Sequence, residues 1–244
     1  MGMPIEIEIV GEGALVRTAL EDAFAYFTQV DEEFSTYKEE SAISRINRGK
    51  LSLHEASEEM RRVFAVSAAA KEETKGYFDI RRPDGRVDPS GIVKGWAIEE
   101  AAARITAAGF ADFFVNAGGD IASSGQNAAG EPWSVGIENP FAREEIVKVV
   151  YPRGRGIATS GSYIRGAHIY DPHDPGRPLD EVTSVTVIAP SVMRADMLAT
   201  AAFAMGREGI AFLEQLPEVE GYQIDATMTA TMTSGFDRFT HSPA

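Results

Sequence analysis

The dominant spacing of apolar residues differs between the first and the later part of this chain, and that difference limits the possible folds. Before residue 110 apolar residues recur mainly at the three-to-four spacing of helices, whereas later segments mostly have the patterns of strands. The expected helices are a segment with Ala23, Phe27, Val30 and Phe34 on one face, then 56–74, 90–108, 193–204 and about 208–216. The expected strands are 4–10, 113–117, 132–138, 146–152, 156–163 and 183–189, with short strands near the end. Helices that pack on a largely antiparallel sheet predict an α+β fold rather than a doubly wound parallel sheet.

The bulk composition excludes several classes of function. A chain of 244 residues with 44% hydrophobic content can bury a sizeable core, either as one large domain or as two closely joined lobes. A net charge of −14 argues against a surface for nucleic acid or an anionic membrane, because both need clustered lysine and arginine. The absence of cysteine excludes disulfides, thiolate metal sites and a cysteine nucleophile. Any phosphate that the chain binds must therefore be held by local groups.

The apolar segments are also short. None is long enough for a membrane helix or a signal peptide, and residues 4–10 already alternate like a strand. We therefore expect a soluble cytoplasmic protein. Trimming of the sequence would remove an export segment without trace, so export stays open as the alternative.

Residues 87–98, VDPSGIVKGWAI, combine a helix start with features that normally weaken one. The residues at 88–90 are typical of a strand end that turns into a helix N-cap, which places Lys94 in the first helical turn. A cation there opposes the helix dipole, and Gly91 and Gly95 each cost about 1 kcal/mol relative to alanine inside a helix. A phosphate or diphosphate bound at this helix start would explain all three residues. A loosely wound helix start with a solvated lysine explains them equally well.

Asp196 and Thr200 lie four residues apart in a helical pattern and share one face of the helix. A carboxylate and a hydroxyl so placed can bind a hard cation. Mg²⁺ usually keeps water and substrate phosphate oxygens as ligands, so two protein ligands suffice when a diphosphate supplies the rest. The alternative is an aspartate favoured by the helix dipole and a threonine bonded to the preceding turn.

Residues 116–120, NAGGD, follow an apolar strand with two glycines that allow a tight turn or a close approach to a ligand. The pattern matches neither a dinucleotide-binding fingerprint nor a P-loop. A plain β-turn in which Asp120 bonds its own backbone is the simpler interpretation.

His168 ends an expected strand in the run HIYDP, and a histidine in such a turn can act as a general base or orient a carboxylate. A solvated surface histidine is the alternative. His173 and Asp174 raise the question of zinc, but their spacing matches no usual ligand set.

Several aromatic residues lie close in sequence to these glycine-rich and serine-rich segments. Their faces could stack a planar ring such as a flavin or an adenine, although each residue taken singly is more simply explained as part of the core. They are Tyr37, Phe78, Trp96 and Tyr163.

In order and spacing, eight segments that span nearly the whole chain resemble the FAD:protein FMN transferases of the ApbE family. The segments are MGMPIEIEI at 1–9, FSTYKEESAISRIN at 34–47, GYFDI at 76–80, VDPSGIVKGWAI at 87–98, NAGGDI at 116–121, IATSGSY at 157–163, HIYDP at 168–172 and ADMLAT at 195–200.

This resemblance implies a single transferase domain over residues 1–244, with a T-fold-like, two-lobed α+β architecture and FAD in the cleft between the lobes. It also implies a Mg²⁺-dependent reaction. The FMN moiety of FAD is transferred to a threonine or serine hydroxyl of a target flavoprotein, through a phosphoester link, and AMP is released.

Carried over position by position, the resemblance also implies a set of site residues. Mg²⁺ would be held by the Asp196 carboxylate, the Thr200 hydroxyl and the backbone carbonyl of Gly91, where family members often have Ala, Ser or Thr. His168 would deprotonate the acceptor hydroxyl, directly or through a neighbouring carboxylate, and Asp196 would be catalytic as a metal ligand. FAD would be lined by Met1, Tyr37, Tyr77, Phe78, Asp79, Asp88, Lys94, His168 and Ile169, with Asp120 and Ser160 as further neighbours.

Two other functions use the same residues. Water in place of the protein hydroxyl would make the chain an FAD pyrophosphatase that yields FMN and AMP. A non-catalytic FAD-binding protein would yield no AMP with any acceptor, but it gives no reason for the expected metal ligands.

Overall fold

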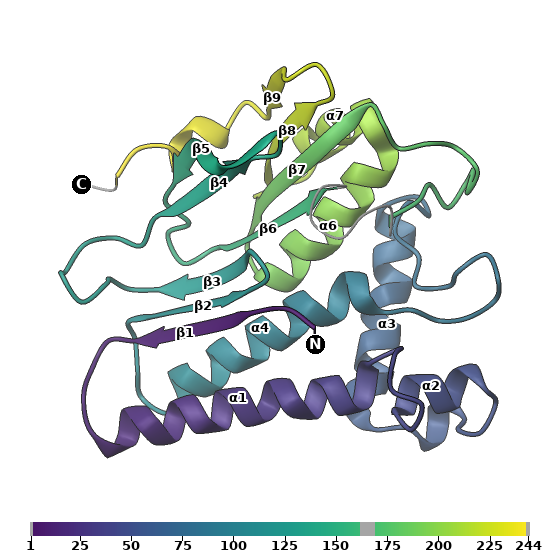
Figure 1. Ribbon diagram of the computed structural model, residues 1–244, viewed down its shortest axis with the longest axis horizontal. Coiled ribbons are helices and arrows are strands. Elements are labelled where there is room, and N and C mark those ends of the chain that lie inside the picture. Colours follow the sequence, from purple (N-terminus) through teal and green to yellow (C-terminus); the bar gives the residue numbers. More distant parts are fainter. Residues whose placement is uncertain (1, 162–168, 243–244) are drawn as a thin grey trace.

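The computed structural model describes residues 2–161 and 169–242. They form a layer of helices packed on an antiparallel sheet whose strands differ in length (Figure 1). The helices are α1 (Ala14–Phe34), α2 (Ala42–Asn47), α3 (Glu58–Glu73), α4 (Ser90–Ala107), α6 (Val192–Met205) and α7 (Gly209–Glu214). The strands are β1 (Ile5–Ile9), β2 (Phe113–Ala117), β3 (Asp120–Ser124), β4 (Val135–Asn139), β5 (Ala142–Val150), β6 (Gly156–Gly161), β7 (Val182–Ala189), β8 (Glu220–Asp225) and β9 (Ala230–Met232). Three short 3₁₀ turns lie at Leu53–Glu55, Gly206–Glu208 and Phe236–Phe239.

Seven of the strands form one sheet in the order β1-β2-β3-β6-β7-β8-β9. Every pairing in this sheet is antiparallel, as the sequence predicts. Strands β4 and β5 leave the sheet after β3 and form a separate antiparallel hairpin. The hairpin lies on the face of the sheet opposite to the helices.

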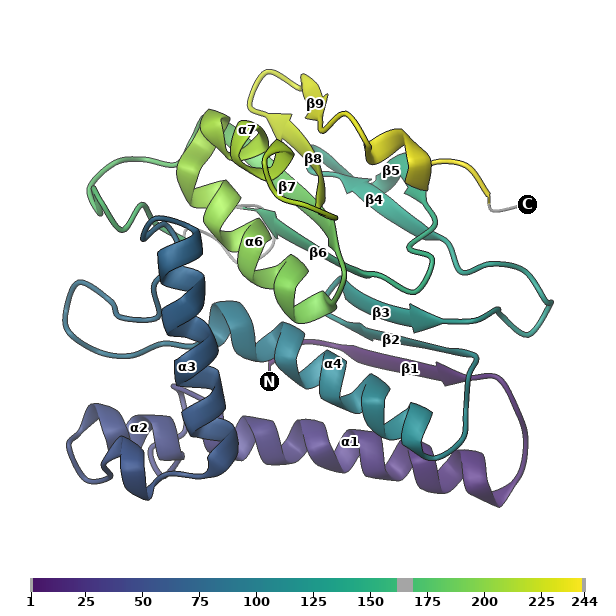
Figure 2. The same cartoon turned by 180° about the vertical axis from the view of Figure 1, so that it is seen from behind.

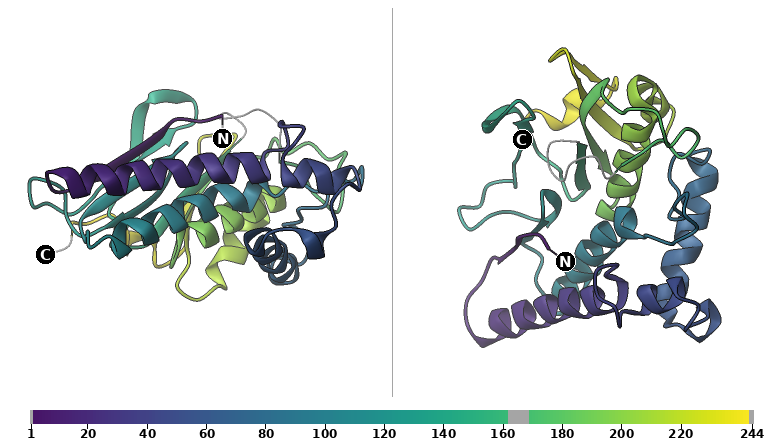
Figure 3. Two further views of the ribbon diagram at one scale, coloured as in Figure 1. Left: turned by 90° about the horizontal axis from the view of Figure 1, so that it is seen from below. Right: turned by 45° about the vertical axis from the view of Figure 1, so that its right-hand side comes forward.

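Helices α1, α4 and α6 cover one face of the sheet, as the view from behind shows (Figure 2). Their apolar residues meet inward-facing strand residues such as Val115, Val185 and Val187 in the larger core. A smaller core lies between the opposite face of the sheet and the β4–β5 hairpin, where Ile121 and Ile157 meet Ile137. Helix α3 runs across the ends of α1 and α4 (Figure 3).

Helix α1 follows the predicted pattern, with Ala23, Phe27, Val30 and Phe34 buried on one face. The same face carries Tyr26, whose aromatic ring is buried although its hydroxyl is polar. That hydroxyl accepts a 3.0 Å hydrogen bond from the Trp96 indole N–H and donates a 3.0 Å hydrogen bond to the Glu59 carboxylate. Helices α1, α3 and α4 are thereby joined by one polar chain within the core.

Two elements differ from the sequence prediction. Residues 42–47 form helix α2, which is not among the expected helices, and the Ser41 side chain caps it by accepting from the Ser44 N–H at 3.1 Å. Residues 120–124 form strand β3, which carries small and polar residues and lacks a strand-like pattern. It is a strand because a tight turn folds it back onto β2.

Throughout the described ranges, 2–161 and 169–242, every helix is too short or too polar to cross a lipid bilayer.

Candidate active site

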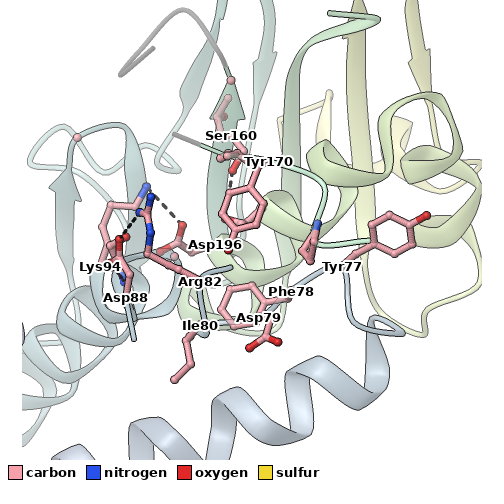
Figure 4. Close-up of a pocket in the computed structure, with 18 residues that line it drawn as sticks. Tyr77, Phe78, Asp79, Ile80, Arg82, Asp88, Lys94, Ser160, Tyr170 and Asp196 are labelled. Carbon is pink, nitrogen blue, oxygen red and sulfur yellow. Dashed lines mark hydrogen bonds and ion pairs between the residues drawn. The ribbon is translucent and has the colours of Figure 1, made fainter. Parts of the chain in front are cut away.

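A cavity of about 100 Å³ lies where the N-terminal end of α4, the end of β6 and helix α6 come together (Figure 4). Segments 77–82 and 169–172 close its remaining sides. The lining residues are Tyr77, Phe78, Asp79, Ile80, Arg82, Asp88, Ser90, Gly91, Lys94, Gly118, Thr159, Ser160, Gly161, Ile169, Tyr170, Pro172, Asp196 and Thr200.

The start of α4 is held by local hydrogen bonding rather than by a standard cap. Pro89 occupies the N-cap position, and the Asp88 carboxylate accepts a 3.2 Å hydrogen bond from the Ser90 N–H. The other Asp88 oxygen lies 3.3 Å from the Arg82 guanidinium (Figure 4). Asp88 therefore links the helix start to the turn that carries Arg82.

Helices α4 and α6 approach closely at Gly95. A methyl group at this position would lie 2.7 Å from Met193 Cα and 2.8 Å from the Val192 carbonyl oxygen, so only glycine fits the interface. The Gly95 N–H donates a 2.9 Å hydrogen bond to the Asp196 carboxylate. The sequence analysis explained Gly95 by a bound anion. The structure gives a different reason for this glycine, which is the close packing of α4 against α6.

Lys94 lies between two buried carboxylates. Its ammonium is 2.5 Å from Asp120 Oδ2 and 3.4 Å from Asp196 Oδ1, and the three side chains are 12%, 1% and 4% exposed. Lys94 is therefore not a solvated lysine, because two carboxylates lie beside its ammonium. With both carboxylates ionised, the cluster has a net charge of −1 within a low-dielectric region.

The electrostatics of this cluster shift the titration of Asp196. Burial raises the pKa of Asp196 to about 7, although the nearby Lys94 ammonium acts in the opposite direction. The Asp120 carboxylate adds to the increase by repulsion. Binding of either a proton or a cation would therefore stabilise the buried Asp196 carboxylate.

Thr200 lies one helical turn after Asp196 on the cavity face of α6. Its hydroxyl is 3.5 Å from the Ser160 hydroxyl on β6. A methyl group on Gly91 would lie 3.6 Å from the Thr200 Oγ1, so the start of α4 also contacts Thr200. Within the described part of the chain, no group of three His, Cys, Asp or Glu side chains is arranged to hold a metal ion. A cation here would depend on hydroxyl, carbonyl and ligand oxygens besides the Asp196 carboxylate.

The glycine pair at 118–119 forms the predicted tight turn, between β2 and β3. Both glycines have positive φ angles, 62° and 94°, and the Gly119 N–H donates a 2.9 Å hydrogen bond to the Asn116 side chain. The simpler interpretation, in which the Asp120 side chain bonds its own turn, is wrong. Its carboxylate instead accepts from the Thr159 N–H at 3.2 Å and pairs with Lys94.

Most of the predicted site residues line this one cavity. Those residues are Tyr77, Phe78, Asp79, Asp88, Gly91, Lys94, Ser160, Ile169, Asp196 and Thr200.

Other predicted residues lie elsewhere or outside the described ranges. Tyr37 is 98% exposed and does not line the cavity. Trp96 is buried in the core, where its indole bonds Tyr26. Met1, Tyr163 and His168 fall outside the described residues. The His173 ring packs edge-on against Tyr77 and bonds the Lys75 carbonyl oxygen at 2.9 Å, so a structural contact accounts for it.

Arg82 and Tyr170 are among the lining residues that the sequence did not predict. Arg82 belongs to a run of arginines around Pro83–Gly85 that looks like an ordinary surface turn. Tyr170 lies two residues after His168. Histidine is rare in this chain, with four residues in all, and this favoured His168 over its neighbour as the candidate. Proximity of Arg82 to the helix start at 88–90 was the only available signal.

Comparison with known proteins gives consistent results. The ApbE family model matches residues 1–83 and 80–223. An FAD:protein FMN transferase from Salmonella typhimurium is 37% identical over 160 residues, which cover 58% of this chain and 45% of the relative. One from Haemophilus influenzae is 24% identical over a gapped alignment of 306 positions, which covers 98% of this chain and 88% of the relative. The chain thus spans about half the length of the more similar of these two relatives.

Solved structures agree over nearly the whole chain. The flavin transferase ApbE from Vibrio cholerae superposes with a TM-score of 0.86 at 27% identity, covering 98% of this chain and 96% of that chain. The ApbE protein from Thermotoga maritima has a TM-score of 0.88 at 22% identity, with 99% and 97% covered, and supports the fold alone. By its family model, which matches most of its length, this chain belongs to the ApbE family.

Proposed function

We propose that this chain transfers the FMN moiety of FAD to a threonine or serine hydroxyl of a target flavoprotein and releases AMP. The observation that carries the proposal is the position of the Lys94, Asp120 and Asp196 cluster. It places the buried Asp196 carboxyl and the Thr200 hydroxyl together in the lining of one cavity, with Lys94 and Asp120 beside Asp196. A carboxylate–hydroxyl pair beside a diphosphate suits a divalent cation. Membership of a family whose relatives carry the transferase name supports the reaction.

The residues present fit a Mg²⁺ ion. Asp196 would supply a carboxylate oxygen, Thr200 its hydroxyl and Gly91 its backbone carbonyl, while diphosphate oxygens and water would complete the shell. Bound Mg²⁺ would stabilise negative charge on the diphosphate and on the AMP leaving group. The raised pKa of Asp196 is consistent with a site that accepts a cation.

The transfer requires one bond to form and one to break. The acceptor oxygen bonds to the phosphorus on the FMN side, the bond from that phosphorus to the bridging oxygen breaks, and AMP leaves with that oxygen. We propose His168 as the base that takes the hydroxyl proton, directly or through a neighbouring carboxylate.

The other residues would bind and orient FAD. Arg82 provides a guanidinium at the cavity wall, which can contact the diphosphate in place of Asp88. Phe78 and Tyr170 provide aromatic surfaces for a planar ring. Met1 and Tyr37 remain predicted FAD contacts. Lys94 would keep the Asp196 carboxylate oriented and reduce repulsion between the two aspartates and the diphosphate.

The test is an incubation with FAD, Mg²⁺ and a candidate flavoprotein, followed by mass spectrometry of the acceptor and chromatography of AMP. We expect the acceptor mass to rise by one FMN less water, with one AMP released for each modification. Free FMN and AMP without a modified acceptor would instead identify an FAD pyrophosphatase. Neither product, with FAD bound, would indicate a binding protein.

A matched pair of variants tests the metal assignment. Asp196→Ala should abolish the Mg²⁺-dependent reaction, whereas Asp180→Ala, a substitution of an exposed aspartate that does not line the cavity, should leave it unchanged. Full activity in Asp196→Ala would rule out the assignment.

A further inference from the structure

The Lys94 ammonium is shared unequally between its two carboxylate neighbours. It lies 2.5 Å from Asp120 Oδ2 but 3.4 Å from Asp196 Oδ1, although both carboxylates are buried. The Asp196 carboxylate is the proposed metal ligand, and an ammonium bonded to it would compete with a metal ion for the same oxygen. The interaction that keeps Lys94 on the side of Asp120 therefore affects metal binding.

The two oxygens of the Asp196 carboxylate differ in their contacts. Oδ2 accepts the 2.9 Å hydrogen bond from the Gly95 N–H, which fixes the carboxylate against α4. Oδ1 faces the Lys94 ammonium at 3.4 Å, which is longer than the roughly 2.7–2.9 Å of a charge-assisted hydrogen bond. Oδ1 is therefore the oxygen better placed to bind a cation, provided that Lys94 does not move closer to it.

The start of strand β3 places Asp120 beside Lys94. Asp120 follows the tight turn at 118–119 and pairs with Ala117 of β2, so the two side chains share one face of the sheet. Ala117 belongs to the larger core, between the sheet and the helices. The Asp120 carboxylate therefore points toward the helices, and it meets the Lys94 side chain of α4 there.

A backbone donor on strand β6 fixes the other Asp120 oxygen. Strands β3 and β6 pair at one position in the described chain, Ile121 with Ile157. Beyond that pair, the Thr159 N–H donates a 3.2 Å hydrogen bond to Asp120 Oδ1. The carboxylate is thus bound to the sheet through one oxygen and to Lys94 through the other. Because the Asp120 side chain is 1% exposed, water does not compete for either contact.

We propose that Asp120 is a positioning residue, which draws the Lys94 ammonium away from Asp196 and so keeps Asp196 Oδ1 accessible to Mg²⁺. This inference rests on the proposed function, because it takes Asp196 as a ligand of the metal. In this role Asp120 acts through Lys94. Without the Asp120 charge, the buried ammonium would move to the remaining carboxylate of the pair, because an unpaired charge in a buried site is costly. Mg²⁺ would then have to displace the ammonium before it could bind.

Binding of the metal alone tests this role, with Mn²⁺ as the probe and free Mn²⁺ measured by electron paramagnetic resonance. Asp120→Asn keeps an oxygen that can accept from the Thr159 N–H and removes the charge that holds Lys94. We expect this variant to bind Mn²⁺ about thirtyfold more weakly than the parent protein. Glu220→Gln is the matched control and should bind Mn²⁺ as the parent does. Glu220 is also buried and ion-paired, but it lies on β8 and does not line the cavity.

A double-mutant cycle with Lys94→Met separates the position of Lys94 from the charge of Asp120. A pure charge effect would make Asp120→Asn weaken Mn²⁺ binding by the same factor with and without Lys94. Because Asp120 acts through Lys94, we expect a loss of only about threefold in the Lys94→Met background. Equal factors in the two backgrounds would overturn the proposal. If Asp120→Asn alone does not fold, a thirtyfold loss between Lys94→Met and the double variant would overturn it as well.

The Mg²⁺ dependence of turnover gives a second readout. A high Mg²⁺ concentration should restore kcat in Asp120→Asn, because the metal then displaces the ammonium from Asp196, and only the Mg²⁺ concentration at half-maximal rate should rise. A loss of kcat that Mg²⁺ does not restore would overturn the proposal in favour of a structural role. If the parent protein binds no Mn²⁺, either alone or with ADP, the proposed metal site itself is wrong. If the parent and Asp120→Asn bind Mn²⁺ equally, the role of Asp120 alone is wrong.

Discussion

The Gly95 N–H donates a 2.9 Å hydrogen bond to the Asp196 carboxylate, so one contact joins helix α4 to the proposed metal ligand on α6. The bond requires a close approach of the two helices, which a side chain at position 95 would prevent. The geometry of the site therefore depends on the packing of the helices beneath it.

Gly95→Ala tests this dependence. Helix propensity alone would favour alanine by about 1 kcal/mol. The new methyl, however, would lie 2.7 Å from Met193 Cα, and relief of that overlap should cost about 1–3 kcal/mol in the free energy of unfolding and displace Asp196. Denaturant unfolding and the Mg²⁺ dependence of the reaction measure the two effects. Gly176→Ala is the control, since its methyl would meet only Asp174 Oδ1 at 3.7 Å.

The raised pKa of Asp196 predicts how stability depends on pH. Between its ordinary value of 3.8 and about 7, the folded protein keeps a proton on Asp196 that the unfolded chain has lost. The folded state then binds more protons, so this group's contribution to stability falls as pH rises through that window. Thermal unfolding of the metal-free protein should therefore show a steeper loss between pH 4 and pH 7 than Asp196→Asn does. Parallel curves would contradict the shift.

Mg²⁺ should reverse this loss at the upper end of the window. Because the metal binds the carboxylate and not the acid, the stabilisation by Mg²⁺ should be small near pH 5 and grow toward pH 8. At a Mg²⁺ concentration 100 times the dissociation constant it should reach about 2.7 kcal/mol. Asp196→Asn should show little stabilisation at either pH.

Much of the fold follows from periodicity, whereas the site follows from a few placements that periodicity does not encode. The core face of α1 and strands 113–117 and 183–189 could be predicted because burial alone sets their patterns. The pairing of Lys94 with Asp120 could not, because it depends on a tight turn that returns β3 beside α4. Gly95 had the right signal and the wrong explanation, since loss of helix propensity does not reveal what occupies the space of a missing side chain.

The substitution Tyr26→Phe should lower the stability of the fold without lowering the activity. Removal of the hydroxyl leaves the buried Trp96 indole N–H without its 3.0 Å acceptor, which should cost about 1–3 kcal/mol. Neither residue lines the cavity, so turnover by the folded protein should not change. A double-mutant cycle with Trp96→Phe, measured by denaturant unfolding, should show that the two losses are not additive.

Arg82→Ala tests whether the cation at the cavity wall recognises the diphosphate. Arg82 makes a single 3.3 Å contact with Asp88, so it can turn toward a more highly charged ligand without breaking a bidentate pair. Loss of a partly exposed charge-assisted contact should weaken FAD binding about tenfold. Riboflavin, which lacks phosphate, should bind the variant and the parent protein equally. Arg86→Ala removes a guanidinium from the same turn, but that group bonds Asp84 at 2.6 and 2.8 Å, and Arg86 does not line the cavity. Titration of flavin fluorescence should therefore separate the two arginines, and an equal effect of both would mean that Arg82 acts through the charge of the turn rather than through contact with the diphosphate.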